Sequence, residues 1–230
     1  MLDMVTMDEQ GLGVMSWITP EGVLTYYGYG SGRESRFALL SNNSRKRFYP
    51  SDEKVINLTP AAQIFSAADD SVFIIDSYSN IIKVYSKGEM SDGPSFDFGK
   101  YSIPESFYEF YDAFSAMESL MSGEFAMINR YICDDNIRLA IINVQKQMDL
   151  YSYCGVCSED KWIWFGTGKV GSDLFANSFN QIKEGALYCL FDPSLIGTFP
   201  SSLRKLILNP EILDSVGEDD NYIVAKLILI

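Results

Sequence analysis

Residues Ser71–Glu109 read SVFIIDSYSNIIKVYSKGEMSDGPSFDFGKYSIPESFYE and decide the fold. Two runs rich in Val, Ile and Tyr, Val72–Asp76 and Asn80–Tyr85, are predicted strands joined by a short polar turn. A turn rich in Gly, Ser and Asp is expected at Lys87–Pro94, followed by a third strand at Ser95–Phe98. Three short antiparallel strands with turn residues at close intervals form one unit of a repeated all-β fold.

The rest of the chain repeats this pattern of short strands and turns. Groups of strands recur roughly every 45–60 residues, in the range of propeller blades. We therefore predict a single all-β domain over residues 1–230, a β-propeller of four to six antiparallel blades, with one helical insertion. Further strands are expected at Gly11–Thr19, Gly22–Tyr29, Arg36–Ser41, Arg45–Tyr49, Ala62–Ala67, Glu124–Cys133, Ile137–Val144, Gln147–Cys154, Trp162–Phe165, Ala186–Leu190 and Asn221–Ile230, and a short helical turn at Pro200–Leu208.

The helical insertion is predicted at Ile103–Met121. Pro104 suits the first turn of a helix, and aromatic residues follow at spacings of three and four. In a continuous helix Phe107, Phe114 and Met121 share one face, which we expect to lie on the sheet. The alternative of a membrane-surface helix is disfavoured because its polar face carries Glu and Asp rather than Lys and Arg.

Composition excludes several classes of function. The chain of 230 residues has 31 acidic and 18 basic residues, a net charge of −13, so we expect no nucleic-acid partner. It contains no histidine, which rules out His-dependent catalysis and His-ligated metals. No apolar run approaches the ~18 residues of a membrane span. Met1–Gln10 has three acidic residues and no basic n-region, so no signal peptide is predicted here.

The four cysteines are Cys133, Cys154, Cys157 and Cys189. Cys154 and Cys157 form a CxxC pair, a spacing typical of redox pairs and half zinc sites. No second ligand pair and no βαβ pattern accompany it, so we interpret these residues as cysteines at a strand end. In an oxidising compartment, a disulfide between two of the four cysteines is the alternative.

Three short motifs resemble cofactor or metal sites but lack the required context. Asp97-Phe98-Gly99 spells the kinase metal-binding tripeptide without the accompanying kinase loops. Gly166–Gly171 matches GxGxxG, but no good helix follows, so Gly166–Glu184 is predicted as a loop. Asp76–Asn80 lacks the glycine and distal glutamate of a calcium loop and is predicted as a hairpin turn. We expect neither a cofactor nor a metal.

Aromatic residues at strand positions have two interpretations. Tyr26, Tyr27, Tyr29, Trp162 and Trp164 could line an exposed surface for a sugar or a peptide, or could belong to the core. The core is favoured for strand aromatics in general.

Two neighbouring stretches of the chain resemble a known protein family. They are Asp97–Tyr101 followed by Ile103-Pro104, and the preceding DSVFIIDSYSNIIKVYS. This segment resembles the six-bladed β-propeller family of bacterial envelope proteins, related in architecture to NHL and TolB-like propellers. Glu218–Asn221 and the strand after it are similar to that family's closing strand.

The resemblance implies an exported and often lipid-anchored propeller with no catalytic residues to carry over. Six blades of about 45 residues need more than this chain, which would supply four or five. Either the N-terminal portion of a six-bladed propeller is missing or the propeller is smaller. A truncated propeller exposes strand edges and is expected to self-associate through them.

Three functional hypotheses follow. The first is a non-catalytic binding or scaffold module of the cell envelope, in the periplasm or on the outer-membrane surface, with an unknown small-molecule, glycan or protein ligand. Its predicted ligand-binding residues are Asp76, Tyr78, Asp97, Tyr101, Trp162 and Trp164.

The second hypothesis is a lyase or glycoside-acting propeller that uses Asp76, Asp97 or Asp192 with Tyr101. Such chemistry needs two carboxylates ~5–9 Å apart. The third is a protein-docking propeller that binds through an open edge or through the Ile103–Met121 helix.

Overall fold

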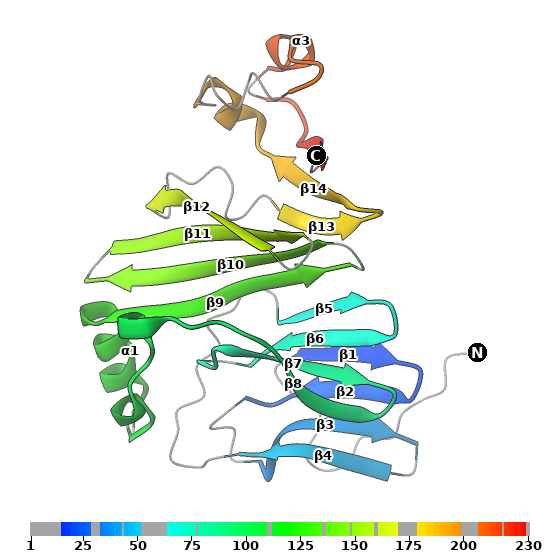
Figure 1. Cartoon of the computed structure of the whole chain (residues 1–230), viewed down its shortest axis with the longest axis vertical. Helices are drawn as coiled ribbons and strands as arrows, with labels where there is room; N and C mark the ends of the chain where they lie inside the picture. Colours follow the sequence, from blue (N-terminus) through cyan, green and yellow to red (C-terminus); the bar gives the residue numbers. More distant parts are fainter. Residues whose placement is uncertain are drawn as a thin grey trace.

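The computed structural model describes residues 15–28, 33–42, 44–51, 64–76, 78–109, 112–134, 137–147, 149–158, 161–169, 179–198, 207–217 and 219–228. Within them the chain forms four antiparallel sheets of three or four strands with little helix, so the all-β prediction is confirmed. In each sheet the strands lie side by side in chain order (Figure 1).

The first sheet contains β1 (Met15–Thr19), β2 (Gly22–Tyr26), β3 (Ser35–Ser41) and β4 (Ser44–Pro50). The second contains β5 (Phe65–Ala68), β6 (Ser71–Ile75), β7 (Ile81–Ser86) and β8 (Glu89–Ser95). The third contains β9 (Glu124–Cys133), β10 (Ile137–Lys146), β11 (Asp149–Ser158) and β12 (Lys161–Lys169). The fourth contains β13 (Phe179–Lys183), β14 (Ala186–Phe191) and β15 (Ile223–Ile228).

Two-residue turns join many of these strands. Asp69, Lys87, Gln147 and Glu184 each open such a turn at φ between 50° and 55°. Positive φ at this position matches the twist of the flanking strands, so the turns set the register of their hairpins.

The third strand of the opening stretch was misplaced by the sequence prediction. Lys87 and Gly88 alone make the turn, with φ of 50° and 82°, and the strand is Glu89–Ser95 rather than Ser95–Phe98. Gly93 lies within this strand, and a glycine suits the position because a Cβ there would lie 2.4 Å from Cγ2 of Val84. Small and polar residues that suggested a long turn therefore form β8.

The prediction of a loop at Gly166–Glu184 is also wrong in part. Strand β12 continues to Lys169, and β13 occupies Phe179–Lys183; residues 170–178 lie outside the described residues. Residues 11–14 of the first predicted strand, Tyr29, Glu218 and most of the Pro200–Leu208 turn also lie outside them. In the described residues nearest to that turn, short helical segments are present at η3 (Pro193–Thr198) and α3 (Glu211–Asp214).

The predicted helix at Ile103–Met121 is not continuous. A 3-10 segment, η2 (Glu105–Glu109), precedes α1 (Ala113–Ser122), and another, η1 (Gly99–Tyr101), lies upstream. Asp112 is extended at φ −135° and caps α1, because its Oδ1 accepts a hydrogen bond from the Ser115 amide at 2.8 Å. Because the helix is interrupted, residues before and after the break do not share one helical face. Phe107 is buried, whereas Phe114 and Met121 are exposed.

The third sheet is packed on both faces. Ala140, Ile142 and Val144 of β10 belong to the largest apolar cluster, which also holds residues of the first two sheets. Leu139 and Ile141 point to the other face and pack with the fourth sheet. Burial of both faces explains why β10 is an almost continuous apolar run rather than an alternating one.

All four cysteines are buried thiols that are not joined in disulfides. Cys154 lies inside β11 whereas Cys157 lies next to its last residue, Ser158, and a spacing of three places their side chains on opposite faces of the sheet. Cys154 and Cys189 share the apolar cluster between the third and fourth sheets. Burial raises the pKa values of Cys133 and Cys189 to about 12.

We expect Ile141→Ala to lower the free energy of unfolding by about 2–5 kcal/mol, because Ile141 is fully buried and the change leaves a cavity. The exposed Ile163→Ala on β12 serves as the control and should change stability by less than about 0.5 kcal/mol. Urea unfolding of both variants gives the two values. Equal effects would contradict burial of Ile141 between β10 and the fourth sheet.

We also expect the native protein to be nearly inert to a thiol reagent such as dithionitrobenzoate at pH 8, since its thiols are buried and two have strongly raised pKa values. All four should react once the chain is unfolded in guanidinium. Rapid labelling of a cysteine in the native state would show that this burial is wrong.

Candidate functional site

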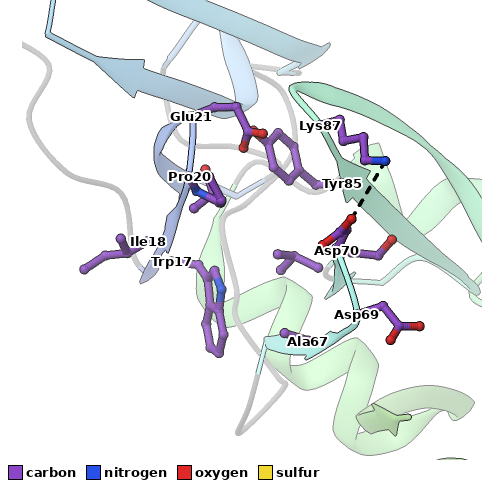
Figure 2. A pocket seen from close by; sticks show the side chains of 12 residues that line it. Trp17, Ile18, Pro20, Glu21, Ala67, Asp69, Asp70, Tyr85 and Lys87 are labelled. Carbon is purple, nitrogen blue, oxygen red and sulfur yellow. Dashed lines mark hydrogen bonds and ion pairs between the residues drawn. The ribbon is translucent and has the colours of Figure 1, made fainter. Parts of the chain in front are cut away.

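A hollow of about 330 Å³ lies where hairpin ends of the first and second sheets meet (Figure 2). The β1–β2, β5–β6 and β7–β8 hairpins contribute its walls, each through residues in or next to a two-residue turn. The lining residues are Trp17, Ile18, Thr19, Pro20, Glu21, Ala67, Asp69, Asp70, Ser71, Val72, Tyr85 and Lys87. We call this site the hairpin hollow.

One wall of the hairpin hollow is apolar. Trp17, Ile18 and Pro20 line it from the β1–β2 hairpin (Figure 2). The Trp17 ring packs on Phe65, with ring centroids 6.1 Å apart, and this contact holds it to the core cluster. The hollow therefore has a half-buried indole surface against which a flat or ring-shaped ligand can pack.

A second wall, to which the tip of the β1–β2 hairpin also contributes Glu21, is polar and mostly acidic. The hydroxyl of Tyr85 donates a hydrogen bond to Glu21 at 3.0 Å, and burial raises the pKa of this tyrosine. Lys87 forms an exposed ion pair with Asp70 at 3.8 Å (Figure 2). With Asp69, the wall presents three carboxylates and one ammonium, which together can accept and donate hydrogen bonds to a polar ligand.

A buried ion pair joins the same two sheets away from the hollow. Arg36 of β3 contacts Asp76, which follows β6, and Tyr26 of β2 donates to Asp76 Oδ1 at 3.5 Å. The side chain of Asp76 is fully buried, and desolvation raises its pKa to about 6 although Arg36 and Lys83 act in the opposite direction. The charge is retained near neutral pH because its partners offset the cost of burial.

Tyr49 links this ion pair to the second sheet. Its ring lies 5.1 Å from the Arg36 guanidinium and 4.5 Å from the Lys83 ammonium. Its hydroxyl donates to Asp92 at 2.9 Å, and Lys83 donates to the same carboxylate oxygen at 2.6 Å. Burial and Asp92 raise the pKa of Tyr49 to about 12. Tyr49 adopts φ 52°, a strained conformation for a tyrosine that these contacts stabilise.

The predicted site residues do not gather in one place. Asp76 belongs to the buried ion pair. Tyr78 is buried against Phe107, with centroids 4.9 Å apart, in the cluster under α1. Asp97 is exposed, and its Oδ1 accepts from the Gly99 amide at 2.8 Å, so it caps a turn. The half-buried ring of Tyr101 lies 5.6 Å from the ammonium of Lys146.

Trp162 and Trp164 do lie together. Their rings stack at 5.3 Å and 19° on β12, and Phe96 packs edge-on against both. Trp164 lies over Gly155 of β11, where a Cβ would be 2.7 Å from its ring, so the indole fills the gap left by the glycine. Trp164 is 42% exposed, whereas Tyr26 and Tyr27 are buried core residues.

The three carboxylates considered for catalysis each have a local structural partner. Asp76 pairs with Arg36, and Asp97 caps the turn at Gly99. Asp192 accepts hydrogen bonds from the amide and hydroxyl of Ser194, which lower its pKa at the start of η3. In the described part of the chain, no three His, Cys, Asp or Glu side chains are grouped to hold a metal ion.

The sequence prediction missed the hairpin hollow. Neither Asp69-Asp70 nor Lys87-Gly88 was predicted as a two-residue turn. A local sequence pattern identifies a single turn and does not show which turns lie together in space. The hollow depends on three hairpin ends from two sheets meeting, which only the packing of the sheets decides.

Comparisons with known proteins bear on the fold alone. No family model matches the chain, and no curated protein matches it. A crystal structure of a protein from Bacteroides fragilis NCTC 9343, named "putative exported protein", matches with a TM-score of 0.63 at 16% identity. The match covers 91% of this chain and 63% of that protein, so the chain spans less than two thirds of its length. Among the described helices, none is long and apolar enough to cross a membrane.

The Asp76 carboxyl should make stability depend on pH. Its pKa is higher in the folded chain, about 6, than the 3.8 of a free carboxyl, so its protonated form favours folding. This contribution is complete below about pH 4 and is lost as pH rises through 6. Between pH 4 and 7 wild type should therefore lose up to about 3 kcal/mol relative to Asp76→Asn, as measured by urea unfolding. A pH-independent difference would contradict the raised pKa.

Proposed function

We propose that the chain is a non-catalytic binding module of the cell envelope, built of β-propeller blades, that holds a small polar ligand in the hairpin hollow. The observation that carries this proposal is the hollow itself, which is lined by the Trp17 indole, by carboxylates and by an ammonium. A concave site with an apolar surface and a few polar groups is typical of ligand pockets.

The propeller assignment is supported by the connectivity of the sheets. Each sheet is a meander whose strands follow chain order, and the third sheet packs between apolar clusters on both faces. Successive meanders stacked face to face are the arrangement of blades. Export is supported by the name of the matched Bacteroides protein. Self-association through open strand edges remains a prediction.

A sugar unit is the ligand class that best suits the two walls. The apolar face of a pyranose ring can pack on the Trp17 indole, while its hydroxyls donate to Glu21 and Asp70 and accept from Lys87. The Tyr85 hydrogen bond fixes Glu21 in place before the ligand arrives, which lowers the entropy cost of binding.

The test is a glycan array followed by thermal-shift titration with any sugar that binds. A bound sugar at about 100 times its Kd should stabilise the fold by about 2.7 kcal/mol. The double variant Asp70→Asn/Lys87→Gln alters only exposed side chains and should weaken binding at least about tenfold with little change in the free protein's stability. Lys161→Gln, exposed on β12, is the matched control. Absence of any sugar binding, or binding unaffected by the double variant, would refute a glycan site in the hollow.

A further inference from the structure

Helix α1 (Ala113–Ser122) is attached to the molecule by one side only. Ala116 and Leu120 are buried and pack with Phe107, Phe125 and Tyr78. The helix flanks the sheets beside the ends of β9 and β10 (Figure 1). The side opposite Ala116 and Leu120 faces away from this cluster.

Apolar side chains lie along one flank of that outward side, beside the exposed Glu118. Phe114, Met117 and Met121 are 79%, 46% and 44% exposed, and their spacings of three and four place them along one side of the helix. We call these three residues the α1 stripe. A surface helix ordinarily presents charged residues on its solvent side, but α1 contains a single charged residue, Glu118. The stripe is therefore an apolar surface on the outside of the protein.

The surroundings of the α1 stripe are uniformly acidic in sequence. Residues 101–129 contain five carboxylates and no Lys or Arg. All five side chains are exposed: Glu105, Glu109, Asp112, Glu118 and Glu124. Hydrogen bonds from Ser115 lower the pKa of Asp112, and Glu124 also forms an ion pair with Lys100 at 3.9 Å. An apolar stripe beside negative charges is complementary to a surface that is apolar in the middle and basic at its margins.

We propose that the α1 stripe docks a basic amphipathic helical segment of a partner protein. The apolar side of such a segment covers Phe114 and the two methionines, whose flexible side chains adapt to different shapes. Its Lys and Arg residues approach the surrounding carboxylates. An anionic membrane would be repelled by these charges, and a second copy of the stripe would place like charges together. This binding site is separate from the hairpin hollow.

The experiment measures binding of a labelled peptide by fluorescence anisotropy. The probe is a Leu/Lys peptide of about four helical turns with Leu at spacings of three and four. It should bind the intact chain, and binding should weaken when salt is raised from about 0.05 M to about 0.5 M. A scrambled peptide of the same composition and a Leu/Glu counterpart should bind at least about tenfold more weakly.

The double variant Phe114→Ser/Met117→Ser should weaken peptide binding at least about tenfold. Both side chains are exposed, so its circular dichroism and urea midpoint should match wild type. Leu208→Ser, 91% exposed and distant in sequence from α1, is the control and should bind the peptide normally.

Several results would overturn the proposal. These are absence of Leu/Lys peptide binding up to about 100 μM, equal binding by the double variant, and equal binding of the scrambled peptide. Self-association of wild type that the double variant abolishes would assign the stripe to a second copy of the chain. Co-sedimentation with phosphatidylcholine vesicles that the same variant abolishes would assign it to a membrane surface.

Discussion

The ion pair between Arg36 and Asp76 is the constraint on which the first half of the structure depends. It is buried between two sheets, so each charge would be costly to bury without the other. Tyr26 and Tyr49 add a hydrogen bond and a ring contact from the first sheet. Because these contacts set how the first sheet lies against the second, they also set how the hairpin ends around Trp17 and Asp70 meet. A charge far from the hollow thus helps to shape it.

The second half of the structure depends on apolar packing instead. Strand β10 directs Ala140 and Ile142 to one apolar cluster and Leu139 and Ile141 to another, so the third sheet lies between its neighbours. The buried cysteines belong to this packing as small apolar side chains. Polar contacts specify the pairing of the first two sheets, and apolar burial complements them. Apolar burial is less directional than these contacts but makes the larger total contribution to stability.

The two proposed binding surfaces differ in how they are built. The hairpin hollow is concave, is assembled from hairpins of two sheets, and offers polar groups held by neighbouring side chains. The α1 stripe lies along a single convex helix, and its methionines are partly exposed. The first suits a small ligand that is recognised by hydrogen bonds, and the second suits a partner that brings its own shape. Carboxylates outnumber basic side chains at both, which favours ligands with donors or positive charge.

The sequence by itself determined the all-β class and most strand positions, because alternating Val, Ile and aromatic residues between turn residues report local preference directly. It also placed Asp76 and the paired tryptophans on the strands and turns where they lie. It failed at Asp112, where hydrogen bonds donated by Ser115 to the carboxylate restart the helix and leave Phe114 exposed, and at Lys87-Gly88, where two positive φ angles shorten the turn. The partner of Asp76, the hollow and the outward face of α1 were decided by the tertiary structure alone. Each of them depends on which surfaces meet across tens of residues of chain, and local propensity carries no information about that.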